Sequence, residues 1–152
     1  MALAASELSD RAKVAAPTRE LGWKRRLRLA GEILVAYLRA RRALARAPIA
    51  SVVTSLRNEP SRVGRPACDN PLAEARRLGR AVSRVLALLP GDTRCLARSL
   101  VLAQLLARRG IPATLVIGAR AAPDFLAHAW VEHGGRAVLP PGDGSFGRLV
   151  EL

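Results

Sequence analysis

The run CLARSLVLAQLLARRGIPATLVIGARAAPDFLAHAWVE, residues 95–132, contains the change of pattern that decides the fold. Its first part is apolar nearly all round and stops at Gly110, which is typical of a helix buried in the middle of a domain. A β-type run follows at 113–119, and an alternating run follows at 126–132. We therefore expect a buried helix over about 94–109 that leads directly into two strands.

The residues after this run predict one more strand. His133-Gly134-Gly135 is typical of a hairpin turn, and the short run RAVL at 136–139 follows it before prolines and glycines end the pattern. Strands joined by short turns in this way predict a small antiparallel sheet of about three strands.

The residues before the run predict helices. Apolar residues recur at helical spacing over 23–46 and over 72–89, with arginines at many of the remaining positions. The segment between them, 49–71, is rich in proline and glycine, so we expect mostly loop there, with room for a helix at 49–57. Helices followed by a buried helix and an antiparallel sheet make an α+β domain.

The length fits one domain. The chain has 152 residues, half of them apolar, which is enough for a packed core. We expect residues 1–20 to be a loosely ordered N-terminus and residues 21–152 to form a single domain. Its helical part is 21–90, and its second part, 91–152, holds the buried helix and the sheet.

The charge is strongly basic but unevenly spread. The net charge is +13, of which residues 1–50 carry +7 (11 basic, 4 acidic), 51–94 carry +4 (8 and 4) and 95–152 carry +2 (6 and 4). The excess permits an acidic partner, but it lies away from the segment with candidate chemistry. Aromatic residues make up 3% of the chain, which argues against a stacking platform for single-stranded nucleic acid, so we expect no nucleic-acid partner.

The cysteines and the N-terminus predict a cytoplasmic protein with reduced thiols. Two cysteines, Cys68 and Cys95, do not suggest a disulfide framework. The opening MALAASELSD lacks a basic region and a long apolar core, and no apolar stretch is long enough for a transmembrane segment.

The sequence predicts no metal and no cofactor. The two cysteines and two histidines stand at unrelated spacings, at positions 68, 95, 128 and 133, which argues against a zinc site. The stretch GIPATLVIG at 110–118 lacks the lysine and the spacing of a phosphate-binding loop. A dependence on ATP stays open.

Cys95 is the first candidate for chemistry, because it falls in the first turn of the expected central helix, which Asp92 or Thr93 could cap. Unpaired backbone N–H groups and the positive end of the helix dipole lie there, and both favour a thiolate. The same N–H groups could stabilise an oxyanion in acyl transfer. The alternative is a small buried hydrophobe, as free cysteines often are. Cys68, in the proline-rich loop, is interpreted as structural or incidental.

His128 is the second candidate. In the alternating run it shares a strand face with Leu126, Trp130 and Glu132, and from such a face it can reach the start of a helix packed on the strand. The alternative is a surface or satisfied core histidine. His133 falls in the hairpin turn, where we expect it to be exposed to solvent.

A cysteine–histidine pair needs a third group that orients the imidazole and supports its charged form. The next expected strand ends in Pro140-Pro141, so the nearest acid is Asp143. Glu132 shares the face of His128 but stands about 13 Å further along the strand. We therefore rank Asp143 first, with a backbone carbonyl or a water as alternatives.

These motifs together resemble one family. Residues 95–132 are similar to the core of the leader peptidases of lasso peptide biosynthesis, which are transglutaminase-like, papain-related cysteine proteases. The matching features are Cys-Leu-x-Arg-Ser-Leu opening a helix, Arg-Arg-Gly closing it, a strand Leu-Val-Ile-Gly, and Ala-His-Ala-Trp-Val-Glu. The similarity extends weakly to the closing GRLVEL, residues 147–152, and the helical first half fits only in length and character.

The resemblance implies a function and a site. It implies that Cys95 is the nucleophile and His128 the base of a cysteine peptidase that removes the leader from a ribosomally made lasso peptide precursor. Family members often have an Asp on the strand after the histidine strand, and that position falls near Pro140 in this chain. Asp143 is therefore a substitute by proximity only.

The resemblance also implies partners. Besides the precursor peptide these are a separate leader-binding recognition protein, because the helical residues 1–90 lack the strands of a winged-helix-like module, and the lasso cyclase. Two alternatives stay open. One is a transglutaminase-like acyl transferase, and the other is a non-catalytic basic binding module that uses the arginines of 23–46 on nucleic acid or a membrane surface.

Overall fold

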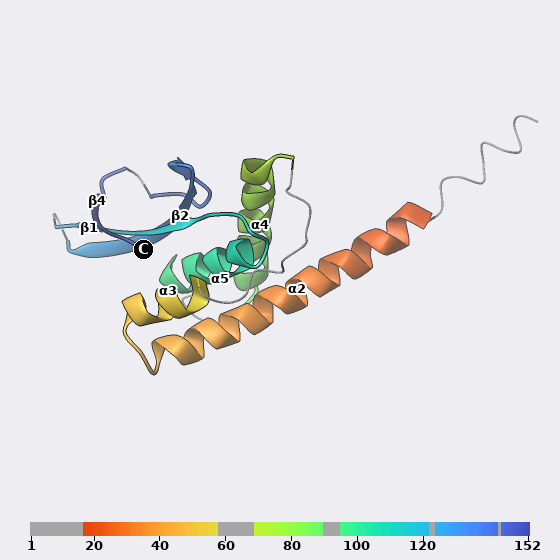
Figure 1. Ribbon diagram of the computed structural model, residues 1–152, viewed down its shortest axis with the longest axis horizontal. Coiled ribbons are helices and arrows are strands. Elements are labelled where there is room, and N and C mark those ends of the chain that lie inside the picture. The colour runs from red at the N-terminus through yellow and green to blue at the C-terminus, as the bar shows by residue number, and fades with distance from the viewer. Residues whose placement is uncertain (1–16, 58–68, 90–94, 122–123, 143) are drawn as a thin grey trace, which may run out of the picture. The chain divides into compact units, whose positions relative to one another are not determined.

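The computed structural model describes residues 17–57, 69–89, 95–121, 124–142 and 144–152 (Figure 1). The chain divides into two compact units, Met1–Glu32 and Ile33–Leu152. The second unit contains the sheet and all the residues considered below as a site.

The described elements confirm the α+β class. The helices are α2 (Pro17–Leu44), α3 (Ile49–Arg57), α4 (Pro71–Leu86) and α5 (Cys95–Ala107), and the strands are β1 (Thr114–Arg120), β2 (Leu126–His133), β3 (Arg136–Ala137) and β4 (Gly147–Glu151). Among the described helices, none combines the length and the apolar character needed to cross a membrane.

Two of the helices differ from the expected bounds for reasons of capping. α2 begins at Pro17, and proline suits the first helical position. α4 begins at Pro71, because Asn70 Oδ1 accepts a hydrogen bond from the amide of Ala73 at 3.0 Å. The expected apolar stripe of α4 is confirmed by buried Leu78 and its neighbours on that face, namely Ala75, Val82 and Leu86.

α5 is the central helix that the sequence predicted. It packs against α3, α4, β1 and β2, and its buried side chains face in several directions. It ends where Gly110 adopts a positive φ of 67°, and the amide of Ile111 then donates to the carbonyl of Leu106 at 3.0 Å. Because α5 is packed on these four elements, the core determines where its first residue, Cys95, lies.

The sheet is antiparallel with the order β3-β2-β1-β4. Gly134 and Gly135 take positive φ values of 56° and 72° in the predicted hairpin turn. β3 is shorter than the expected 136–139, because the amides of Val138 and Leu139 both donate to the carbonyl of Val131, at 2.8 and 3.3 Å.

The fourth strand, β4, was not predicted. It pairs with β1 on the side away from β2, with a register shift between Ile117 and Gly118. All five of its residues are exposed. A strand without a buried face needs no alternation of apolar and polar residues, so its sequence does not indicate a strand. The expected meander of three strands is therefore correct for β1, β2 and β3 but incomplete.

Candidate active site

Cys95 is the first residue of α5, with a free and half-buried thiol. This confirms the predicted position at a helix start, where backbone N–H groups lack helical partners. Arg98 follows one turn later, and its Nε is buried with no hydrogen-bond partner among the described residues. Helical spacing puts Arg98 on the same side of α5 as Cys95. The expected capping residues, Asp92 and Thr93, lie outside the described residues.

Ser99 attaches the first part of α5 to the strand that carries His128. Its Oγ donates a hydrogen bond of 2.9 Å to the carbonyl oxygen of Ala129, and the side chain is fully buried. Residues four apart lie on the same face of a helix, so Cys95 and Ser99 share a face. Ala129 directly follows His128 on β2. The bond therefore attaches α5, one turn after Cys95, to the residue that follows His128 on β2, a role that the sequence analysis did not assign to Ser99.

The ring of His128 is half-buried and held by three contacts. Its Nε2 lies 3.0 Å from the carbonyl oxygen of Pro140. The indole of Trp130 stacks on it with 6.1 Å between ring centroids, and the ring of Phe146 lies at 5.3 Å in a tilted arrangement. Together these contacts restrict the rotation of the imidazole, so one orientation of the ring is selected.

The other ring nitrogen, Nδ1, has no hydrogen-bond partner among the described residues. No hydrogen bond joins the Cys95 thiol to the His128 ring either, as far as the described chain extends. Catalytic hydrogen bonds are often long in proteins without substrate and tighten when it binds. The site thus has a thiol at a helix start and an imidazole of which, among the described residues, only Nε2 has a hydrogen-bond partner.

Gly118 makes room for the indole that supports His128. It stands opposite His128 in the register of β1 and β2. A Cβ at this position would lie 2.9 Å from the ring of Trp130 and 2.9 Å from the carbonyl oxygen of Gly147. Glycine is therefore needed for the indole to lie across β1.

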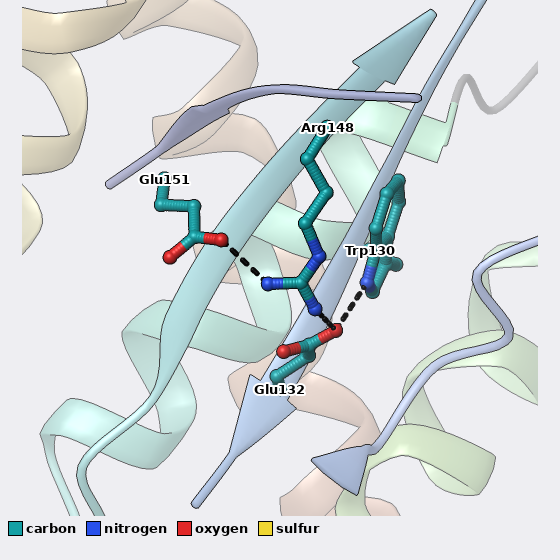
Figure 2. Close-up of polar contacts among 4 residues, drawn as sticks. All are labelled: Trp130, Glu132, Arg148 and Glu151. Atoms are coloured by element: carbon teal, nitrogen blue, oxygen red, sulfur yellow. Dashed lines mark hydrogen bonds and ion pairs between the residues drawn. The ribbon is translucent and has the colours of Figure 1, made fainter. Parts of the chain in front are cut away.

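Glu132 belongs to a separate cluster on the same face of β2. Figure 2 shows its carboxylate between Trp130 and Arg148, with Glu151 on the far side of the guanidinium. Its Oε1 accepts from Trp130 Nε1 at 2.8 Å and from Arg148 at 2.5 Å, and Arg148 also donates to Glu151. The hydrogen bonds to Glu132 and Glu151 raise the pKa of Arg148 further above its usual range. The carboxylate of Glu132 thus links β4 to β2 through Arg148.

The remaining candidate residues divide in two. Asp143 and Cys68 lie outside the described residues, so the role of Asp143 stays a prediction. His133 is half-buried rather than exposed, because its Nδ1 lies 2.6 Å from the carbonyl oxygen of Pro112. No group of three or more potential metal-binding side chains of His, Cys, Asp or Glu occurs in the described part of the chain.

Comparison with known proteins places this arrangement in a family. The model of the transglutaminase-like superfamily matches residues 34–151, which include α5 and all four strands. Comparison with curated proteins and with solved structures gave no match. The chain belongs to the transglutaminase-like superfamily, which includes cysteine proteases and acyltransferases.

Proposed function

We propose that this protein is a cysteine peptidase that removes the leader peptide from a ribosomally made lasso peptide precursor. Four observations support the peptidase part: the superfamily, the free thiol of Cys95 at the start of α5, His128 on the adjacent β2, and the hydrogen bond from Ser99 to Ala129. The bond from Ser99 to Ala129 carries most weight, because it attaches the cysteine face of the helix to the histidine strand. The choice of a lasso precursor rests on the resemblance of residues 95–132 alone.

The proposed reaction passes through an acyl-enzyme. Nδ1 of His128 takes the proton from Cys95, and the thiolate attacks the carbonyl carbon of the last leader residue. Backbone N–H groups at the start of α5 stabilise the oxyanion of the tetrahedral intermediate. His128 then gives its proton to the leaving amine as the C–N bond breaks. Water attacks the thioester, His128 accepts its proton and returns it to the sulfur, and the leader leaves with a free carboxylate.

The proposal includes partners and a compartment. The precursor is delivered by a separate leader-binding protein, and the product passes to the lasso cyclase, which favours a cytoplasmic site of action. The basic excess of residues 1–50 suits an acidic surface on such a protein. Binding of the leader with high affinity by this chain alone would argue against the separate recognition protein.

The test is a cleavage assay with full precursor, followed by mass spectrometry. Cys95→Ala should abolish cleavage, and Cys68→Ala, which removes the other thiol, should not. A new free C-terminus on the leader supports hydrolysis. Transfer of the leader acyl group to an added amine, with little hydrolysis, would favour the acyltransferase alternative, which the superfamily equally allows. Full activity in Cys95→Ala would exclude both.

A further inference from the structure

The partner of His128 determines which of its ring nitrogens carries the proton. A carbonyl oxygen only accepts hydrogen bonds, so the 3.0 Å contact between Nε2 and the oxygen of Pro140 requires a proton on Nε2. A neutral imidazole has one N–H, and Nδ1 is then the basic nitrogen. This is the nitrogen that the described residues leave without a partner.

We propose that the main-chain carbonyl of Pro140 is the orienting group of the His128 base and replaces a side-chain carboxylate. The inference rests on the proposed function, because it assigns the third member of that site. In many cysteine and serine hydrolases a carboxylate or amide holds the imidazole tautomer. In this chain a backbone oxygen at position 140 accepts the same hydrogen bond. Pro140 is therefore a positioning residue.

The sequence around this carbonyl makes it a rigid acceptor. Pro140 and Pro141 both have a ring-locked φ, and a residue before proline is limited to extended conformations. The carbonyl between the two rings therefore has little freedom to turn away. On its N-terminal side, Leu139 is 5% exposed, and Val138 is hydrogen-bonded to Val131 and packs against Gly79 of α4.

The segment after the prolines supports the other side of the ring. Phe146 contacts His128, and Arg120 of β1 lies over the Phe146 ring at 5.7 Å. Arg120 also donates to Ser145 Oγ at 3.1 Å. Gly142 has a φ of +87°, and a Cβ there would meet the Phe146 ring at 2.7 Å. These contacts hold Phe146 against the imidazole, while the carbonyl oxygen of Pro140 accepts the hydrogen bond from Nε2.

A neutral acceptor has a chemical consequence. A carboxylate would stabilise the imidazolium by its charge, whereas a carbonyl stabilises it only through one dipole. The carbonyl selects the tautomer and the ring orientation, and the charged form of His128 gains less from it. A carboxylate at position 140 should therefore favour the imidazolium that forms when His128 takes the proton from Cys95.

The chain offers an internal control for the tautomer. It has only two histidines, and His133 bonds to a proline carbonyl through the opposite nitrogen, Nδ1 to Pro112. We therefore expect the two imidazoles to have opposite tautomers when neutral. Nitrogen-15 NMR of the full chain with labelled histidine measures this directly, and His133→Gln assigns the two signals. Nε2–H on His128 together with Nδ1–H on His133 supports the inference, and Nδ1–H on His128 overturns it.

The functional arm uses Pro140→Asp, which keeps Pro141 and the backbone carbonyl. Activity measured as kcat/KM should persist to higher pH than in the wild type, because the carboxylate favours the imidazolium. KM should stay within about twofold, since position 140 acts through His128. Asp124→Asn, an exposed acid outside the His128 contacts described above, is the control. If the pH profile of Pro140→Asp matches that of the wild type, the proposal that the Pro140 carbonyl replaces a carboxylate is overturned.

The two proposals fail separately. The expected pair of tautomers in a chain that cleaves no precursor would overturn the proposed function and keep the inference. Cleavage that requires Cys95, with Nδ1–H on His128, would overturn the inference and keep the function. The NMR measurement needs only the wild-type chain and His133→Gln, so it decides the tautomer even where Pro140→Asp does not fold.

Discussion

Two residues on one face of β2, His128 and Glu132, are used in opposite ways. Glu132 is 7% exposed, and its Oε1 accepts hydrogen bonds from both Trp130 and Arg148. His128, four residues earlier, is half-buried, and of its two nitrogens only Nε2 has a partner among the described residues. Trp130 stands between them and contacts both. We propose that the Glu132 end of β2 stabilises the sheet and that the His128 end takes part in the chemistry.

The largest expected effect is loss of activity when His128, at one end of β2, is replaced. His128→Gln retains an N–H that can donate to Pro140 but provides no base, so cleavage of the precursor should fall by a factor of at least about 10². The melting temperature should stay close to that of the wild type. Initial cleavage rates and thermal unfolding measure the two quantities. His133→Gln is the matched control, and a His128→Gln rate equal to the control rate would remove His128 from the site.

Gly118→Ala should displace the Trp130 indole, which lies between His128 and Glu132 on β2. Its Cβ would meet the Trp130 ring and the backbone of Gly147, so we expect a loss of stability on the order of 1–3 kcal/mol. Urea unfolding measures it. Gly31→Ala in α2 is the control, because nothing lies within 4 Å of its Cβ and alanine favours a helix. Equal stability of the two variants would mean that the indole does not need this space.

Glu132→Ala should lower the stability of the protein and leave the activity at the His128 end of β2 unchanged. It removes the acceptor of the buried Trp130 N–H, which should cost about 1–3 kcal/mol of unfolding free energy. Cleavage per folded molecule should change little. Glu151→Ala breaks only the exposed side of the cluster, so its effect should be about 1 kcal/mol or less. A strong loss of kcat in Glu132→Ala at full folding would contradict the division of the strand.

Ser99→Ala should have a small effect on stability and a distinct effect on activity. Loss of the buried bond to Ala129 should cost about 1 kcal/mol. The rate of cleavage should also fall, because the bond positions the cysteine face of α5. Ser55→Ala, at an exposed site on α3, should lie within about 0.5 kcal/mol of the wild type. Unchanged kcat/KM in Ser99→Ala would show that packing alone positions Cys95.

The elements that sequence predicted are those whose patterns are set by burial. α5, β1 and β2 have strong apolar runs, and their predicted bounds agree with the structure within about two residues. β4 has no buried residue, so its pairing depends on β1 and on contacts that no local pattern encodes.

The site divides in the same way. Cys95 and His128 could be proposed as site residues because a cysteine at a helix start and a histidine on an alternating strand have recognisable surroundings in sequence. The acceptor at Pro140 is a backbone oxygen, and every residue has one, so residue type could not single it out. The link from Ser99 to Ala129 joins residues 30 positions apart and depends on how the helix packs on the strand.

The central claim is that Cys95 and His128 act as a pair, and the rate of Cys95 alkylation by iodoacetamide tests it most directly. The measurement uses Cys68→Ala as background, so that Cys95 is the only thiol. We predict that His128→Gln slows alkylation at least about tenfold, because the imidazole takes the thiol proton, while His133→Gln leaves the rate unchanged. Equal alkylation rates in the two histidine variants would contradict the account.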